Sequence, residues 1–213
     1  MDDDILRRLR RFRTDYFPRF RKKFRQLVDH GQHPSVLFIG CSDSRVVPYL
    51  LMDCGPGELF IERNVGNLVP PHDAVSGYHG TGAAIEFAVL RLGVKHIVVC
   101  GHSHCGAIRA LYDDSSPETP HINQWLELAR DAMLPLAPCE ETLRRTEQRS
   151  IVFQLERLMA YPMVAQGVQA GRLFLHGWHY LIEDGRVMVL DLSSGTFVAA
   201  DSASTDGPLD TLQ

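Results

Sequence analysis

The sequence predicts an α/β fold: a mostly parallel central β-sheet flanked by helices, with a C-terminal hairpin at the sheet edge and an N-terminal helical arm. Short, almost wholly apolar segments at 35–40 and 96–101 alternate with a segment of helical periodicity at 81–93. Strands that are apolar on both faces are typical of a parallel sheet that helices cover on both sides. Residues 172–198 differ, because the turn EDGR inside them contains an Asp-Gly pair that favours a hairpin.

The other elements follow from the same two periodicities. The segment 81–93 places its apolar residues on one helical stripe and ends at Gly93, a typical helix terminator. The segment 57–64 is predicted to be a further buried strand. Three more helices are expected, at 105–113, 121–134 and 140–160.

Residues 1–30 are predicted to form the helical arm. Within 4–30, aromatic residues and leucines recur at helical spacing between arginines, and Pro18 is expected to break or restart the helix. We interpret the basic side as a solvated helix face rather than an anion-binding site. Residues 1–213 are expected to form a single domain, whose polar end, 203–213, is a flexible tail.

Composition narrows the class of protein. The chain has 213 residues, of which 45% are hydrophobic, and a net charge of -4, so we expect neither a nucleic-acid partner nor a membrane span. The N-terminal segment lacks the apolar core of a signal peptide, which favours a cytoplasmic protein. An odd number of irregularly spaced cysteines argues against a disulfide framework and for reduced thiols, some of them metal ligands. The five are Cys41, Cys54, Cys100, Cys105 and Cys139.

Two of the predicted strands end in polar clusters, CSDSR and CGHSHCG. In open α/β sheets ligands bind beyond the carboxyl ends of the strands, so both clusters are expected to meet at one place. Two thiolates and an imidazole suit Zn²⁺, and such a set leaves a fourth position for water or for another protein ligand. The candidate groups are Cys41, Asp43, His102, His104 and Cys105.

At these residues the sequence resembles the β-class carbonic anhydrases. The resemblance spans about residues 15–195 and rests on CSDSR, on GELFIERNVGNLV and on EFAVLRLGVKHIVVCGHSHCG. It implies one Zn²⁺ per subunit, bound by Cys41, His102 and Cys105, and reversible hydration of CO₂ to bicarbonate and a proton by zinc-bound hydroxide. It also places the family's Asp/Arg pair, which orients the zinc-bound hydroxide, at Asp43 and Arg45.

The resemblance also implies an apolar pocket for CO₂. Gln32 stands where plant-type members have a substrate-contacting glutamine, and Phe60 and Val65 match their apolar pocket residues. Phe87 stands where many members have tyrosine. The backbone N–H of Gly106, at the start of a predicted helix, is expected to stabilise a bound oxyanion.

In some members of the family the residue matching Asp43 closes the zinc as a fourth ligand and switches the enzyme off. The members that bicarbonate inhibits use Trp, Arg and Tyr at a second site. Here Arg63 and Tyr180 match, but Phe38 replaces the tryptophan, which weakens the case for such inhibition. We therefore predict an open zinc, with Asp43 paired to Arg45.

The resemblance further implies a homodimer or a larger homo-oligomer, with pockets at the subunit interface and N-terminal helices wrapped around the partner. We interpret Arg63 as a structural residue at that contact, and His72 and His79 as structural residues that are also candidate proton shuttles. A carbonyl sulfide or carbon disulfide hydrolase on the same scaffold remains an alternative. A second is a non-catalytic zinc protein, in the cytoplasm or in a carbon-fixing compartment.

Overall fold

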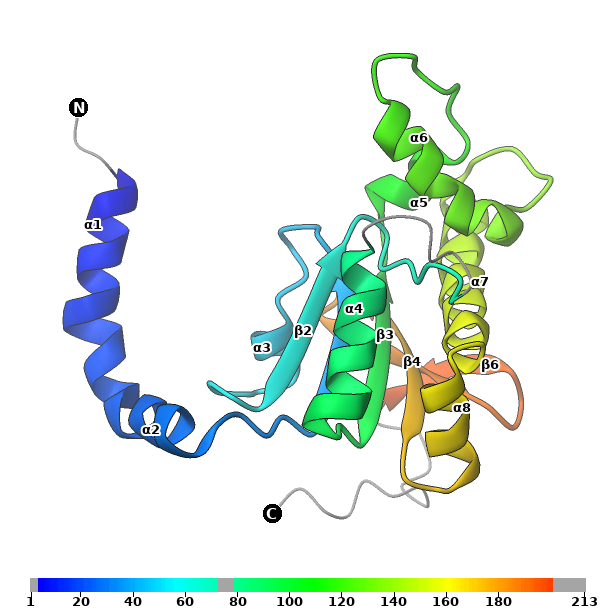
Figure 1. Ribbon diagram of the computed structural model, residues 1–213. Coiled ribbons are helices and arrows are strands. Elements are labelled where there is room, and N and C mark those ends of the chain that lie inside the picture. Colours follow the sequence, from blue (N-terminus) through cyan, green and yellow to red (C-terminus); the bar gives the residue numbers. More distant parts are fainter. Residues whose placement is uncertain (1–3, 73–78, 201–213) are drawn as a thin grey trace.

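A computed structural model describes residues 4–72 and 79–200 of the protein, so the tail predicted at 203–213 lies outside the described residues. The core is one six-stranded sheet with the order β2-β1-β3-β4-β5-β6 (Figure 1). The first four of these strands are parallel, and β5 and β6 continue the sheet antiparallel. The strands are β1 (Val36–Cys41), β2 (Leu59–Asn64), β3 (His96–His102), β4 (Phe174–Leu181), β5 (Arg186–Asp191) and β6 (Thr196–Ala199).

The predicted mostly parallel sheet is confirmed, but the segment at 172–198 is more than a hairpin. Its first strand, β4, pairs parallel with β3 as well as antiparallel with β5. The loop between β4 and β5 has four residues, 182–185, and Gly185 has a φ of 66°. A third strand, β6, follows a turn in which Gly195 has a φ of 68°. The sequence interpretation missed this strand because its polar turn resembles the end of the domain.

Most helices lie within the predicted segments, and two short helices are additional. Two short helices were not expected, α3 (Pro48–Leu51) and α8 (Pro162–Gln169), and both have proline in the first turn. Proline fits there because the first amide groups of a helix have no acceptor within it. The other helices are α1 (Asp4–Arg11), α2 (Phe17–His30), α4 (Gly80–Glu86), α5 (Gly106–Ala110), α6 (Pro120–Leu126) and α7 (Glu140–Met159), with π-helical turns at Phe12–Tyr16 and Phe87–Leu92 and a 3₁₀ turn at Glu127–Ala132.

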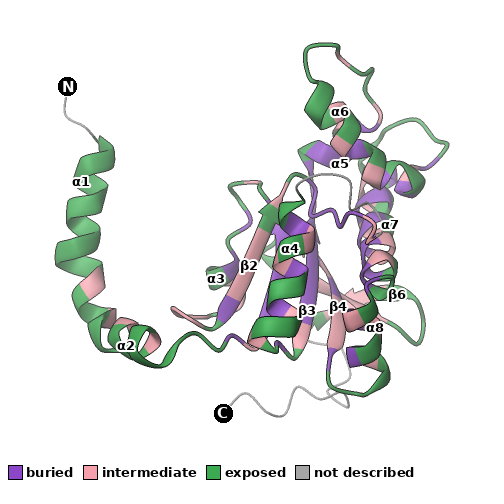
Figure 2. Cartoon of the chain, viewed as in Figure 1, coloured by how far each residue is buried: buried purple, intermediate pink, exposed green. Residues whose placement is uncertain are grey.

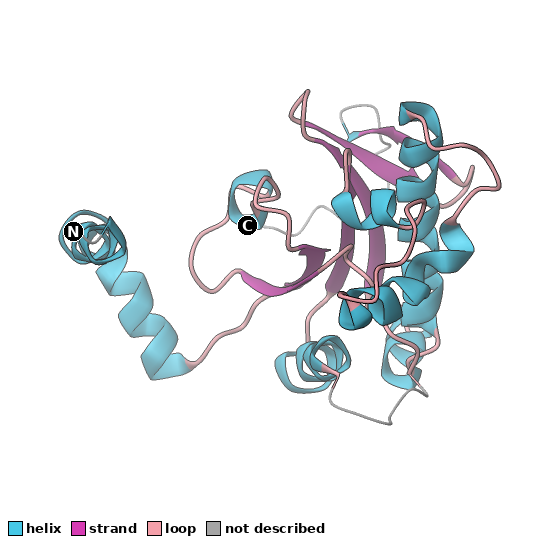
Figure 3. Ribbon diagram, turned by 90° about the horizontal axis from the view of Figure 1, so that it is seen from above, coloured by secondary structure: helices cyan, strands magenta, loops and turns pink. Residues whose placement is uncertain are grey.

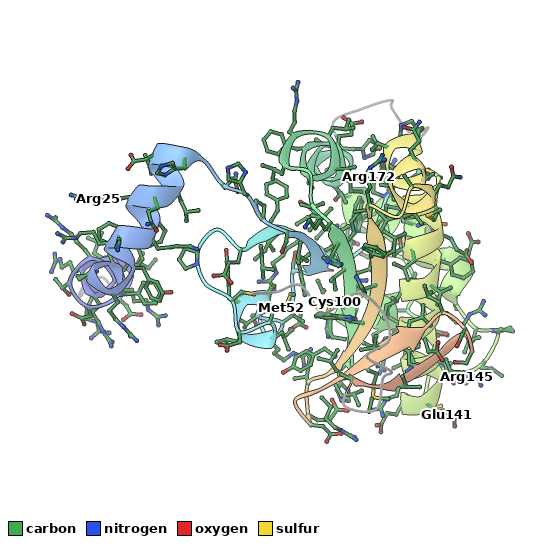
Figure 4. All side chains as sticks on the ribbon, turned by 90° about the horizontal axis from the view of Figure 1, so that it is seen from below. Arg25, Met52, Cys100, Glu141, Arg145 and Arg172 are labelled. Carbon is green, nitrogen blue, oxygen red and sulfur yellow. The ribbon has the colours of Figure 1, made fainter. Side chains whose placement is uncertain are left out.

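Helices cover the two faces of the sheet unequally. Leu37 and Ile39 of β1 point to the face where α4, α7 and α8 form the main core, which includes Ile151. Phe38 and Cys100 point to the other face, where residues around α3 pack on the sheet. Figure 4 shows Met52, next to α3, and Cys100 on this side. Complete burial raises the pKa of the Cys100 thiol to about 12, as fits a structural cysteine.

The N-terminal arm consists of α1 and α2, joined by a π-helical turn just before Pro18, and no residue in it is buried. Figures 2 and 3 show it standing clear of the sheet, and the colouring of Figure 2 marks most of its residues as exposed. An aromatic stripe runs along the arm, in which Phe12 stacks on Tyr16 and Phe17 on Phe24. None of the helices in 4–72 and 79–200 is long and apolar enough to cross a membrane.

The glycines of the central strands make room for α7. A Cβ on Gly101 would lie 2.8 Å from Cδ1 of Ile151, and one on Gly177 would lie 3.0 Å from its Cγ2.

We expect Ile151→Ala to lower the free energy of unfolding by about 2–5 kcal/mol, because it leaves a cavity under the strand that carries His102. Urea unfolding followed by circular dichroism measures the loss. Glu156→Ala, an exposed position of the same helix, is the control and should change stability by less than about 0.5 kcal/mol. Equal losses in both variants would contradict this account of the core.

Candidate metal centre

Three side chains with metal-binding atoms converge at the carboxyl ends of β1 and β3. Cys41 is the last residue of β1, His102 is the last of β3, and Cys105 precedes α5. The two strands are neighbours in the sheet, with Gly40 opposite Cys100, so their ends come together. The ligand atoms of all three residues lie within 4.8 Å of one another and all three residues are buried. Two sulfurs and one nitrogen at this spacing can hold one tetrahedral ion.

His102 shows that the cluster fits a metal ion. Its Nδ1 lies 2.8 Å from the carbonyl oxygen of Ser103, and because a carbonyl only accepts, Nδ1 carries the hydrogen. Its Nε2 is buried and has no hydrogen-bond partner among the described residues. A lone pair that faces two cysteine sulfurs without a donor is expected of a metal-ligating histidine, whose other nitrogen is held by a carbonyl group.

The two cysteine side chains shift each other's pKa in opposite directions. Hydrogen bonding from the Cys105 thiol lowers the pKa of Cys41 to about 4, and the same interaction raises the pKa of Cys105. The Cys41 sulfur also accepts backbone hydrogen bonds from Gly66, at 3.4 Å, and Asp43, at 3.5 Å. These amides stabilise a thiolate, which is the form that binds metal.

Asp43 and Arg45 form a bidentate pair beside the cluster. Nε of Arg45 donates to Oδ1 of Asp43 at 2.9 Å, and Nη2 donates to Oδ2 at 2.7 Å. These bonds hold the pKa of Asp43 well below its usual range, so the carboxylate stays ionised. The same Oδ2 lies 3.9 Å from Nε2 of His102, so the carboxylate borders the ligand atoms. Nη2 of Arg45 also donates to the carbonyl of His104 at 3.1 Å, which links the two strand-end loops.

Arg63 has a role that the sequence analysis did not find. Its Nε donates to the carbonyl of Cys41 at 2.9 Å, and its Nη2 donates to the carbonyl of Asp43 at 2.7 Å. Within the chain Arg63 therefore fastens the loop that carries the first metal-binding residue, whereas we had interpreted it as a contact to another subunit. The register of β1 and β2 places Gly40 opposite Arg63, and the sequence carries no local signal of this pairing.

The second ligand-bearing loop has its own supports. Oγ of Ser103 donates to Glu183 and accepts from the amide of Ile182 at 2.9 Å, which ties the loop to the end of β4. His104 has a φ of 56°, its side chain is exposed, and its Nε2 lies 3.6 Å from Glu183. His104, one of the candidate groups in the sequence, therefore points away from the three converging ligand residues.

The residues predicted to bind substrate fall into two groups. Val65 precedes Gly66, whose amide contacts the Cys41 sulfur, and Gly106 follows Cys105. Both residues therefore lie directly beside the cluster. Phe60 and Phe87 stack on each other with 5.7 Å between ring centroids, but Phe60 lies four residues before the end of β2, about 13 Å along the strand. Gln32 is exposed between α2 and β1. Within one chain the structure does not bring Gln32, Phe60 and Phe87 to the cluster.

The remaining candidates lie around the same strands. Phe38 is fully buried and makes an edge contact with Trp178, with ring centroids 6.4 Å apart, while Tyr180 packs in the same core cluster. His72 contacts the ring of Tyr161, and His79 is exposed immediately before α4. Among the residues that the structure describes, neither His72 nor His79 has a contact that identifies it as a proton shuttle.

Comparison with known proteins agrees with this geometry. A family described as carbonic anhydrase matches residues 36–187, which include all three metal-binding candidates. A structure of the β-carbonic anhydrase CcaA is 39% identical and superposes with a TM-score of 0.86 over 92% of this chain and 98% of that one. The chain belongs to the β-carbonic anhydrase family.

Other family members extend the comparison. A carbonic anhydrase of Synechococcus elongatus is 40% identical over 205 residues, which cover 92% of this chain and 74% of the relative. A structure from Sordaria macrospora, described as a tetrameric β-carbonic anhydrase, is 29% identical with a TM-score of 0.70 and covers 88% of this chain and 92% of that one. The similarity to this family therefore extends over most of the chain and is not limited to the metal-binding loops.

The two histidines of the loop allow a direct test of the ligand assignment. We expect His102→Ala to reduce bound zinc from about one ion per chain to near zero, because two cysteines alone make an incomplete site. His104→Asn, which suits the left-handed backbone at that position, should retain the metal. Atomic emission on protein purified with zinc measures both. Loss of zinc from His104→Asn with retention in His102→Ala would reverse the assignment.

Proposed function

We propose that the protein catalyses the reversible hydration of CO₂ to bicarbonate and a proton, with one Zn²⁺ per chain bound by Cys41, His102 and Cys105. The observation that carries this proposal is the buried, unpartnered Nε2 of His102 facing two cysteine sulfurs, next to the ion-paired carboxylate of Asp43. When bound, zinc lowers the pKa of its water to about 7, which supplies a nucleophile near neutral pH.

Asp43 is proposed as the residue that orients this chemistry. Its carboxylate stays ionised beside Arg45 and has an oxygen 3.9 Å from the metal-facing nitrogen of His102. A carboxylate can only accept hydrogen bonds, so it would accept one from water and align the water's lone pair toward CO₂. Arg45 holds the carboxylate in position through two side-chain bonds and one backbone bond.

The substrate pocket is proposed to require a second copy of the chain. Val65 and Gly106 lie beside the cluster and would line it from within one chain, with the Gly106 amide available to a product oxygen. Gln32, Phe60 and Phe87 lie away from the metal-binding cluster of their own chain. We propose that they line the cluster of the neighbouring copy instead. An apolar wall with a single amide donor suits CO₂, which has no dipole and accepts only weak hydrogen bonds.

A homo-oligomer, at least a dimer, fits the exposed surfaces of the chain. Phe12, Tyr16 and Val28 of the arm and Phe87 and Leu90 near α4 are large apolar side chains that face solvent. Large apolar side chains that gather on the surface, as Phe12 and Tyr16 do on the arm, mark an interface. The tetrameric assembly of the Sordaria macrospora relative supports the same proposal. A cytoplasmic location, where reduced thiols persist, remains a prediction.

The alternatives make different demands on the site. A protein that uses zinc only as a structural element has no need of the Asp43–Arg45 pair, so this pair favours an enzyme. Carbonyl sulfide and carbon disulfide are also linear and apolar, and the ligand set does not distinguish them from CO₂. Their hydrolysis is therefore the second candidate, to be separated by assay.

Stopped-flow CO₂ hydration on zinc-loaded protein tests the proposal. We expect turnover at pH 7–9, and a fall in kcat/KM of about 10²–10⁴-fold in Asp43→Asn, which keeps the size of the side chain but loses the charge. Asp53→Asn, a solvent-exposed acid outside the site, is the matched control and should behave as the wild type. Turnover of carbonyl sulfide without CO₂ hydration would establish the alternative function.

The position of Asp43 is a separate prediction. Because Arg45 keeps the pKa of the carboxylate low and binds both of its oxygens, we expect Asp43 to stay on Arg45, away from the metal, in crystals of the zinc-loaded protein. In Arg45→Ala the carboxylate loses this partner and should turn to the metal. Crystal structures at about pH 7 and above about pH 8, well above the usual carboxylate range, measure its position. Asp43 bound to zinc in the wild type above pH 8 would contradict the prediction.

A further inference from the structure

A buried acid and a buried histidine lie next to the metal-binding cluster. Glu147 is in the middle of α7 and is 4% exposed, and His179 is in β4 and is fully buried. Oε1 of Glu147 accepts from the backbone N–H of Cys105 at 3.0 Å, and Oε2 lies 3.0 Å from Nε2 of His179. One carboxylate thus connects a helix, a strand and a metal-binding residue.

The direction of these bonds defines what the pair does. An ionised carboxylate only accepts, so Nε2 of His179 carries the hydrogen and donates to Glu147. Nδ1 of His179 is buried and has no partner among the described residues, which suits a lone pair better than an unpaired N–H. His179 therefore fixes the rotation of the carboxylate and leaves Oε1 to face the Cys105 amide.

The loop that carries Cys105 needs such a support. It runs from His102 to Cys105 through His104, whose φ of 56° lies in the left-handed region that non-glycine residues seldom adopt. Cys105 is the residue before α5, a five-residue helix with no side-chain cap at its start. The N–H of Cys105 is held by Glu147, and the carbonyl of the same peptide group, at His104, is held by Arg45. The orientation of this peptide, and with it the direction of Sγ, therefore depends on Glu147 on one side and on Arg45 on the other.

Burying a carboxylate is costly unless it is paired and hydrogen-bonded, so its presence here calls for a specific role. Glu147 lines the same closely packed region as His102 and Cys105. We propose that Glu147, oriented by His179, is a positioning residue that sets the geometry of the Cys105 ligand and so the affinity of the site for zinc. The proposal rests on the proposed zinc site and adds to it a pair of residues outside the ligand set.

Zinc affinity of the purified protein tests the proposal. We expect Glu147→Ala to raise the dissociation constant for zinc by about 10–100-fold, the usual effect of removing a hydrogen-bond partner of a metal ligand. Competition with a chromophoric chelator measures the constant. Substitution with cobalt provides a second readout, because the thiolate-to-cobalt absorption bands report the geometry of the sulfur ligands.

Three further variants separate positioning from general stability. Glu147→Gln keeps an oxygen that can accept from Cys105, so it should lose less affinity than Glu147→Ala, and His179→Phe should weaken binding in the same direction. Thr146→Val is the matched control: Thr146 is buried on the same helix but bonds to Tyr112, at 2.6 Å, and not to the ligand loop. It should lower thermal stability without changing zinc affinity or the cobalt spectrum.

The outcomes are distinguishable. If Glu147→Ala does not fold, Glu147→Gln and His179→Phe, which keep the side-chain volume, decide the question. Wild-type zinc affinity and cobalt bands in the folded Glu147 and His179 variants would overturn the positioning role while leaving the proposed function intact. Failure of the wild-type protein itself to bind zinc would instead overturn the proposed function.

Discussion

The parallel pairing of β1 with β3 is the constraint on which the metal-binding cluster depends. It places the ends of two strands side by side, and a cysteine and a histidine at those ends reach the same point without any loop having to bridge them. A slip of one residue in this register would turn each ligand to the opposite face of the sheet. The packing of Ile151 against Gly101 and Gly177 is therefore part of the site, because it holds β3 and β4 at their observed depth under α7.

Around the cluster, the loops are held mainly through main-chain atoms. Arg63 and Arg45 bind carbonyl oxygens of the two strand-end loops, and Glu147 binds an amide. Since every residue type offers the same carbonyl and amide groups, such contacts leave the side chains of the loops free for chemistry. Charged groups from β2, from α7 and from the loop after β1 meet at the ligand-bearing loops in this way.

The sequence predicted the elements whose signal is local. The strands β1 and β3 were recognisable as apolar runs, α7 as a long helical segment, and the cysteine–histidine set by residue type and by resemblance to a family. The short helices α3 and α8 were missed because each is too short to show a helical period, and β6 because a polar turn precedes it. Arg63, Glu147 and His179 could not be identified for a different reason: their partners are distant in the chain, and nothing in the sequence next to them differs from an ordinary charged helix or strand position.

The arm at 4–30 has a consequence for how the protein behaves on dilution. A helix without tertiary contacts is only marginally stable in water, and no side chain of α1 or α2 is buried within its own chain. Within the chain, α2 touches the body of the protein where Leu27 lies against Gly57. If a second copy covers the rest of the arm, as proposed, its helical content becomes a function of protein concentration, because mass action then governs secondary structure as it governs binding.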